Sequence, residues 1–444
     1  MTLETKLSLD NSEAIHEQSV ADVSLATPSL LPAFPRKPLN TTISNCPPSG
    51  IRRFFDIAQT MENVISLGVG EPDFVTPRRI REAAIRALDH GGTTYTANAG
   101  LLSLRKSICK NLSERYNAHY NPETECVVTV GVSEGLDLAF RVLLNPGDEV
   151  LVPDPGYVSY APCIEFAGGI AVPVPTSAKD GFRLHAEAIE AAITPRTKAL
   201  LIGSPANPTG ATQSREDLQK LVDMANQHDF YLVSDEIYDR LTYLGEHTCL
   251  GSLPGARDRT IVLNGFSKAY AMTGWRVGYT CAPEPISRLI LRMHQYTMLC
   301  APHLAQIAAL EALDHAEEDV QAMIADYALR RRFFVDGLNA IGLDCGEPQG
   351  AFYAFPLIKS TGLTSEEFAE RLLMEERVAV VPGGAFGKCG EGHVRCSYAT
   401  SMSQLTSALE KIGRFVERVK AEPGNSRNVN APEPVTIIAE NHHA

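Results

Sequence analysis

Seven short apolar runs, separated by stretches with helical spacing, follow one another between residues 126 and 281. This alternation constrains the fold more than any other feature of the sequence. The runs are residues 127–130, 150–152, 170–174, 199–202, 231–233, 261–263 and 277–280. Strands that are apolar throughout, with helices between them, are typical of a mainly parallel sheet that is covered on both faces. The sequence therefore predicts an α/β fold whose large domain contains a seven-stranded, mainly parallel sheet.

The rest of the chain divides around this sheet. We predict a large domain over residues 76–310, and a smaller α+β domain formed by residues 41–75 together with 311–422. Residues 1–40 are polar and weakly patterned, and residues 423–444 are rich in Pro, Asn and Glu. Both end segments are predicted to be disordered, because they offer little apolar surface to bury.

Composition narrows the classes of function. The 444 residues carry a formal net charge of -13, which argues against a nucleic-acid-binding surface. No apolar run is long enough to span a membrane, and the acidic first forty residues lack the apolar core of a secretory signal. The ten cysteines are scattered singly without a C-x-x-C pair, so we expect neither a disulfide framework nor a metal site. A cytoplasmic location is the default expectation.

Lys268 follows an apolar strand and lies eight residues before Arg276. Burying an unpaired ammonium is costly, whereas a desolvated lysine loses its proton readily and can form Schiff bases. An arginine in a glycine-rich setting suits a phosphate. Together these residues indicate pyridoxal 5′-phosphate as a cofactor. The alternative for Lys268, taken alone, is an exposed lysine on a turn.

Three further polar residues come at or just after the ends of buried strands. Asp235 can hold a proton on a pyridine nitrogen, or can simply accept neighbouring backbone donors. Tyr238 can hydrogen-bond a phenolate oxygen, or can be a packed core tyrosine. Asn207 lies in a loop held by two prolines, where its amide can donate to a ring oxygen or a substrate carboxylate. A plain turn is the alternative for Asn207.

Five more residues are candidates with structural alternatives. Ser133 and the amides at a helix start form a ready phosphate site, although Ser133 can equally be a helix cap. Glu134 suits a helix N-terminus but is awkward beside a phosphate. Tyr157 can stack on a ring and Tyr95 can reach a phosphate from a second subunit, while structural packing explains either tyrosine as well. Arg395, inside an apolar strand, fits a substrate α-carboxylate or an internal salt bridge.

Six ordered motifs in this chain resemble those of the class I/II aminotransferases among the fold-type I pyridoxal-phosphate enzymes. They are Gly-Glu-Pro-Asp-Phe, Tyr-Thr-x-Asn-Ala-Gly, Asn-Pro-Thr-Gly, Ser-Asp-Glu-Ile-Tyr, Ser-Lys-Ala-Tyr-x-Met-Thr-Gly-Trp-Arg-x-Gly and Val-Arg-x-Ser. The resemblance covers about residues 45–420. It looks closest to the subgroup that contains bacterial aspartate, aromatic and N-acetyl-diaminopimelate aminotransferases.

The resemblance implies a catalytic role for Lys268, Asp235 and Tyr238. Lys268 holds the cofactor covalently and then moves the substrate's Cα proton. Asp235 pairs with the pyridine nitrogen, while Tyr238 and Asn207 contact the ring oxygen. The implied phosphate and ring contacts are Arg276, Ser133, Glu134, Ser267, Tyr157 and, from the partner of a homodimer, Tyr95. Arg395, Asn207 and the Gly70 backbone are implied to hold the substrate carboxylate.

One position departs from the family pattern. Many relatives have a phosphate-binding Ser or Thr where this chain has Gly265, so Ser267 is the candidate replacement.

The implied reaction moves the amino group of an aspartate-like, aromatic or related L-amino acid to a 2-oxo acid such as 2-oxoglutarate. A C–S β-lyase of the same fold is the alternative enzyme. A non-enzymatic regulator that senses the cofactor is a remote third, because the leader is too short for a DNA-binding module.

Overall fold

The computed structural model describes residues 39–48, 50, 57 and 60–422. Almost all of the predicted leader and all of the predicted tail lie outside these residues. The chain divides into two units, residues 1–44 and 45–444. The described part of the first unit includes most of the short helix α1 (Thr41–Asn45). All that follows concerns the second unit.

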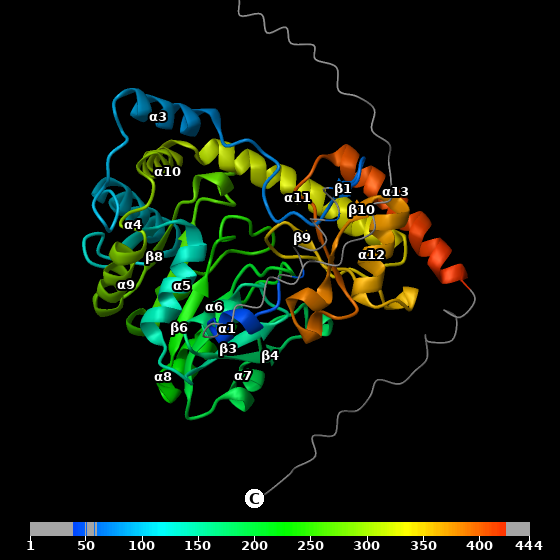
Figure 1. Cartoon of the computed structure of the whole chain (residues 1–444), viewed down its shortest axis with the longest axis horizontal. Helices are drawn as coiled ribbons and strands as arrows, with labels where there is room; N and C mark the ends of the chain where they lie inside the picture. The colour runs from blue at the N-terminus through cyan, green and yellow to red at the C-terminus, as the bar shows by residue number, and fades with distance from the viewer. Residues whose placement is uncertain (1–38, 49, 51–56, 58–59, 423–444) are drawn as a thin grey trace, which may run out of the picture. The chain divides into compact units, whose positions relative to one another are not determined.

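A seven-stranded sheet forms the centre of this unit (Figure 1). Its strands run in the order β2-β8-β7-β6-β5-β3-β4. Strands β3 to β7 are parallel, and β8 is antiparallel to both β7 and β2. The predicted α/β fold with a mainly parallel seven-stranded sheet is confirmed. The bounds are β2 (Cys126–Thr129), β3 (Glu149–Asp154), β4 (Ile170–Pro175), β5 (Thr197–Gly203), β6 (Tyr231–Asp235), β7 (Thr260–Gly265) and β8 (Gly278–Cys281).

Helices cover both faces of the sheet because its strands are apolar on both sides. On β5, Ala199 and Leu201 pack in one core cluster, whereas Leu200 and Ile202 pack in another, as the two-residue period of a strand requires. The first cluster contains α5 (Gly131–Leu143), α6 (Tyr160–Phe166) and α9 (Glu284–Thr297). The second contains α7 (Ala186–Ala192) and α8 (Arg215–His228). A third cluster packs α3 (Arg78–Asp89), α4 (Leu102–Tyr116) and α10 (His303–His315) against β2 and β8.

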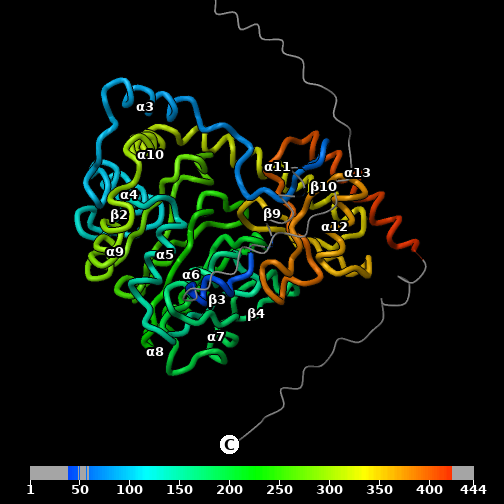
Figure 2. Tube along the Cα trace, in the orientation of Figure 1, coloured from blue at the N-terminus to red at the C-terminus, as the bar shows by residue number. Residues whose placement is uncertain are grey.

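The C-terminal segments build a separate core beside this sheet. Figure 2 shows β1 (Ile65–Ser66), from early in the chain, lying beside β10 (Val378–Ala379), with which it pairs in parallel. A three-stranded antiparallel sheet has the order β11-β12-β9. The remaining bounds are α11 (Glu317–Ala340), β9 (Tyr353–Ala354), α12 (Ser365–Glu376), β11 (Val381–Pro382), β12 (Val394–Ser397) and α13 (Met402–Ala421).

Helix α11 belongs to two cores. Its residues Val320 and Met323 pack with α3, α4 and α10, whereas Tyr327 and Phe334 pack with the C-terminal segments. A 24-residue helix therefore connects the two packed bodies. In the described part of the chain, no helix combines the length and the apolar character needed to cross a membrane.

Candidate active site

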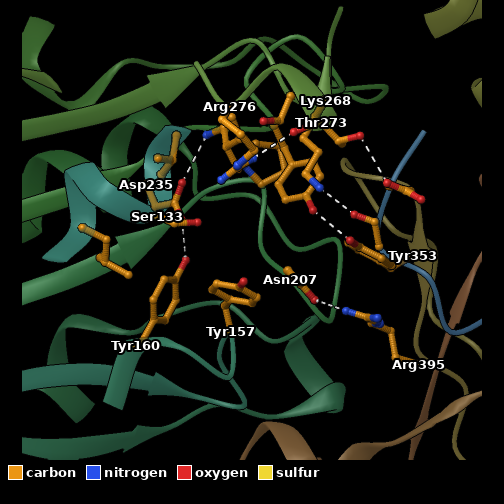
Figure 3. Close-up of a pocket in the computed structure, with 18 of the residues that line it drawn as sticks. Ser133, Tyr157, Tyr160, Asn207, Asp235, Lys268, Thr273, Arg276, Tyr353 and Arg395 are labelled. Atoms are coloured by element: carbon orange, nitrogen blue, oxygen red, sulfur yellow. Dashed lines mark hydrogen bonds between the residues drawn. The ribbon is translucent and has the colours of Figure 1, made fainter. Parts of the chain in front are cut away.

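A cavity of about 360 Å³ lies at the carboxyl ends of β6 and β7, where open α/β sheets place their ligands. Its walls also include the start of α5 and side chains from β9 and β12. Residues of the seven-stranded sheet region and of the C-terminal core therefore both line the cavity. Figure 3 shows the labelled side chains pointing toward one another from these separate elements. Ten of the predicted site residues line the cavity: Gly70, Ser133, Tyr157, Asn207, Asp235, Tyr238, Ser267, Lys268, Arg276 and Arg395.

Lys268 enters the cavity from the loop that follows β7. Its Nζ donates a hydrogen bond to the Gly70 carbonyl at 2.5 Å and lies 5.8 Å from the ring centroids of Tyr238 and Phe352. Burial, reinforced by the Arg395 cation, lowers the pKa of Lys268 to about 8. The amine therefore gives up its proton near neutral pH, as a nucleophile or general base must.

Asp235 is the last residue of β6 and is 7% exposed. One carboxylate oxygen accepts the Tyr160 hydroxyl at 2.9 Å, and the other accepts the Ile237 amide at 3.3 Å. Burial raises the pKa of Asp235 to about 6. A buried carboxylate with so few donors favours a cationic partner. Tyr160 was not singled out from the sequence, because only the fold brings it next to Asp235.

Two phenols meet on the cavity wall. The hydroxyls of Tyr238 and Tyr353 lie 2.8 Å apart, and both side chains are buried. The Tyr353 ring also faces the Arg395 guanidinium, 4.5 Å from the ring centroid. Sequence reasoning missed Tyr353. Its only signal was its place in the aromatic run 350–355.

Arg395 projects from β12 and is 2% exposed. It donates to the Asn207 side-chain oxygen at 2.9 Å and to the Gly68 carbonyl at 2.6 Å. Its Nε is buried without a hydrogen-bond partner, and no carboxylate among the described residues forms an ion pair with it. A buried guanidinium with a free donor is suited to an incoming carboxylate. Asn207, held by Arg395, is more than a turn residue.

The start of α5 and Arg276 form a small cradle. A Cβ added at Gly131 would lie 2.8 Å from a guanidinium nitrogen of Arg276, so a side chain there would fill the space between them. Ser133 is exposed at this helix start, and Arg276 donates to the Thr273 carbonyl at 2.9 Å. Amides at a helix N-terminus together with an arginine suit a phosphate.

The packing of β7 against β8 explains the departure at Gly265. A Cβ at that position would lie 2.9 Å from the Gly278 Cα and 3.1 Å from the Val277 carbonyl oxygen. A serine or threonine would therefore require the two strands to move apart. Ser267 lines the same cavity and is 8% exposed.

Glu134 and Tyr95 do not line the cavity. One Glu134 oxygen contacts His294 Nδ1 at 2.6 Å, and the other accepts the Val130 amide at 2.5 Å. Its carboxylate thus ties α9 to the start of α5, which leaves only the backbone for the predicted phosphate contact. Tyr95 is 80% exposed, and its predicted role from a second subunit stays a prediction.

Comparison with known proteins decides the family. The sequence pattern described as "Aminotransferase class I and II" matches residues 62–412. The chain is an aminotransferase of this family. It is 53% identical over 380 residues to a putative aminotransferase, YugH, of Bacillus subtilis, covering 86% of this chain and 98% of that protein. It is 45% identical over 376 residues to an aspartate aminotransferase of Pyrococcus abyssi, covering 84% and 97%.

A solved structure agrees with these relatives. The crystal structure of an aromatic aminotransferase from Pyrococcus horikoshii matches with a TM-score of 0.79 and 43% identity, covering 83% of this chain and 99% of that chain. The aminotransferase described here transfers an amino group between an amino acid and a 2-oxo acid. Aminotransferases of this class depend on pyridoxal phosphate.

Proposed function

We propose that this aminotransferase binds pyridoxal 5′-phosphate in the cavity around Lys268. The observation that carries the proposal is the pairing of Lys268 and Asp235 in one cavity: a lysine whose pKa is lowered and an aspartate whose pKa is raised, both by burial. When bound, this cofactor supplies an aldehyde that amines capture and a ring that accepts electron density. The cavity contains a suitable side chain for each polar group of this cofactor.

The residues fit the cofactor at four points. The cradle of Gly131, Ser133 and Arg276 would hold the phosphate. Asp235, with few donors of its own, would hold the ring nitrogen in its protonated form. The Tyr238 and Asn207 side chains would contact the ring oxygen, and Tyr157, whose ring meets Tyr160 edge-on at 5.5 Å, would cover the ring face.

Lys268 would carry the proton in the reaction. With its pKa lowered to about 8, a substantial part of the amine is neutral at physiological pH, and its Nζ can take the proton from the substrate Cα and return it. Arg395, Asn207 and the Gly70 backbone would hold the substrate carboxylate. The Arg395 guanidinium, which lines the cavity without a carboxylate partner among the described residues, is the cation available for this contact.

The substrate proposal rests on the relatives. We propose an aspartate-like or aromatic L-amino acid as donor and 2-oxoglutarate as acceptor, because the related proteins are named as aspartate and aromatic aminotransferases. We further propose a cytoplasmic homodimer in which Tyr95, exposed in the single chain, completes the phosphate site of its partner. Residues 76–310 would act as the cofactor domain, and residues 41–75 with 311–422 as the smaller domain.

Replacing Lys268 tests the proposal directly. Purified protein should turn yellow with pyridoxal phosphate, and borohydride should fix the cofactor to Lys268 alone, as mass spectrometry of peptides would show. Lys268→Ala should lose transamination between a panel of amino donors and 2-oxoglutarate, whereas Lys179→Ala, a change at an exposed lysine, should keep it. Fixation to another residue, or substantial turnover in Lys268→Ala, would reject the assignment. Release of pyruvate and ammonia without an oxo acid would instead identify a β-lyase.

A further inference from the structure

Three cysteine side chains converge outside the active site, in the core between α4 and the β2–β8 edge of the sheet. The Sγ atoms of Cys109, Cys126 and Cys281 all lie within 4.8 Å of one another. The three residues are 7%, 1% and 0% exposed. They lie far apart in the sequence and share no spacing motif, so the sequence pattern predicts no metal site.

Backbone pairing fixes two of the sulfurs. Cys126 and Cys281 face each other directly across the antiparallel β2–β8 ladder. The flanking hydrogen bond from the Ala282 amide to the Glu125 carbonyl shows that they are a non-hydrogen-bonded pair. Side chains in such pairs are the closest in an antiparallel sheet. Cys109 approaches this pair from α4, whose neighbouring apolar side chains pack in the same core.

A buried arginine without a counter-ion lies beside the sulfurs. Arg105 precedes Cys109 by one helical turn and is 8% exposed. It donates to the carbonyls of Gly100, Pro122 and Glu123, and no ion pair links it to a carboxylate in the part of the chain that the structure describes. The spacing of four residues places Arg105 and Cys109 on the same face of α4. A buried charge without a partner is costly.

Neither Glu123 nor Glu125 forms an ion pair with Arg105 in the described part of the chain. Glu125 pairs instead with Arg257 at 2.6 Å and accepts the Asn121 amide at 2.7 Å. Arg105 donates only to the backbone carbonyl of Glu123. Three thiolates around a divalent cation carry one net negative charge. Such a centre would balance the single positive charge of Arg105.

We propose that Cys109, Cys126 and Cys281 form a buried three-sulfur site for one thiophilic divalent cation of the zinc group. On binding, three S–H bonds break, three sulfur–metal bonds form, and three protons pass to solvent, so no oxidant is needed. A metal–sulfur bond of about 2.3 Å in a planar three-sulfur site places the sulfurs about 4.0 Å apart, which the observed spacing allows with small movements. Thiolate ligands favour this group of metals.

The buried Tyr120 side chain belongs to the same core cluster, and its hydroxyl has no hydrogen-bond partner within the described residues. The proposed site itself consists of the three sulfurs. The site is distinct from the cofactor cavity, because none of these residues lines it.

Cadmium is the probe that tests the proposal. The full chain, loaded with pyridoxal phosphate and kept reduced by a phosphine, is incubated with Cd²⁺, and a second sample is refolded in its presence. Both are then washed with a chelator. We expect one retained Cd²⁺ per chain in at least one sample, with the ultraviolet absorption of cadmium–thiolate bonds. Added Zn²⁺ during loading should compete for the site.

Cysteine variants locate the ion. Cys281→Ala and Cys109→Ala should each lower retained cadmium at least tenfold. Cys109→Ala is included because alanine has a high helix propensity and should leave α4 intact. Cys163→Ala, the same change at a half-buried cysteine outside the cluster, should retain it. Cofactor absorbance checks that each variant is folded. Less than a tenth of an equivalent in both wild-type samples, unchanged retention in Cys109→Ala, or two of the three thiols found as a disulfide would overturn the proposal.

Discussion

At the scale of single residues, the site depends on two groups whose pKa values burial moves in opposite directions. Lys268 is lowered to about 8 and Asp235 is raised to about 6, so each is less charged than it would be in water. Burying these two groups therefore lowers the stability of the folded protein without its cofactor. Cofactor binding would offset this cost. Active sites commonly hold such groups.

The cost at Lys268 predicts a pH-dependent gain in stability for Lys268→Met. The folded pKa of about 8 lies below the ordinary value of 10.5. Below pH 8 the wild type buries a charged amine at full cost, and above pH 10.5 the amine is neutral in both states. Cofactor-free Lys268→Met should therefore exceed the wild type at pH 7 by up to about 3 kcal/mol.

Urea unfolding at several pH values measures this difference. The advantage of Lys268→Met should shrink as pH rises from 8 to 10.5, while the exposed-site control Lys179→Met should show no such trend. An advantage that stays constant with pH would mean that packing, and not the buried charge, sets the stability of the variant.

The pair of phenols predicts non-additive effects. Tyr353→Phe should lower the free energy of unfolding by about 1 kcal/mol, because it leaves the buried Tyr238 hydroxyl without its partner. Tyr238→Phe should cost a similar amount. The double variant should cost no more than either single change, and denaturant unfolding of all four proteins measures the coupling. Additive losses would show that the two hydroxyls do not stabilise each other.

Sequence reasoning found the residues whose role follows from their place in the chain. Lys268 and Asp235 stand out because polar residues at the ends of buried strands converge at one edge of a parallel sheet. Tyr160 and Tyr353 did not stand out, since their partners Asp235 and Tyr238 are 75 and 115 residues away. Only the folded structure shows that Tyr160 contacts Asp235 and that Tyr353 contacts Tyr238.

At the scale of elements, the contact between β7, β8 and the start of α5 determines the cofactor cradle. The sequence pattern predicts the seven strands but not the antiparallel direction of β8. Its physical reason lies in the connection 266–277, which holds only the short 3-10 turn Thr273–Trp275. A parallel return usually runs through a crossover α-helix, and this connection contains none.

Glycine at position 278 is required by this contact. A Cβ there would lie 2.8 Å from both the Gly131 carbonyl carbon and the Val132 amide nitrogen. Gly278→Ala should therefore push the start of α5 away from β8, lowering stability by 1–3 kcal/mol, as overpacking typically does, and weakening pyridoxal-phosphate binding.

Gly274→Ala is the matched control, because nothing lies within 4 Å of a Cβ built there and the residue lies in the turn that leads into β8. Cofactor titration followed by absorbance, together with thermal unfolding, compares the two variants. Equal cofactor affinity in Gly278→Ala and the wild type would show that the cradle tolerates displacement of the helix start.

At the scale of the whole compact unit, two packed bodies meet along α11 and around the cavity. From the change in pattern after residue 310, the sequence predicts a second, smaller domain. It could not show that α11 packs Val320 in one core and Phe334 in the other. The spacing of apolar residues predicts that a helix has a buried face, but it does not predict which element packs against each turn. The relation between the bodies depends on contacts between segments far apart in sequence.

One such contact joins the end of β3 to the segment after β11. The buried Asp154 carboxylate accepts the backbone amides of Lys388 at 3.2 Å and Cys389 at 3.0 Å. Burial raises the pKa of Asp154, and the two amides partly offset that rise. Gly387 lies against this carboxylate, with φ at +131° and a built Cβ only 2.0 Å from an Asp154 oxygen.

Gly387→Ala should therefore break the contact between the two bodies. The added methyl must displace Asp154, leaving two amides without their acceptor at about 1–3 kcal/mol each. The backbone at Gly387, with ψ at 171°, adds about 1–3 kcal/mol because this region is almost restricted to glycine. Gly181→Ala gives the cost of an αL backbone without a steric contact, because Gly181 has φ at +73° and nothing within 4 Å of its Cβ. Denaturant unfolding should show a loss several times larger for Gly387→Ala. Because Arg395 and Lys268 reach the cavity from opposite bodies, the same variant should raise the KM for the amino acid, and an unchanged KM would mean that the cavity keeps its shape without this contact.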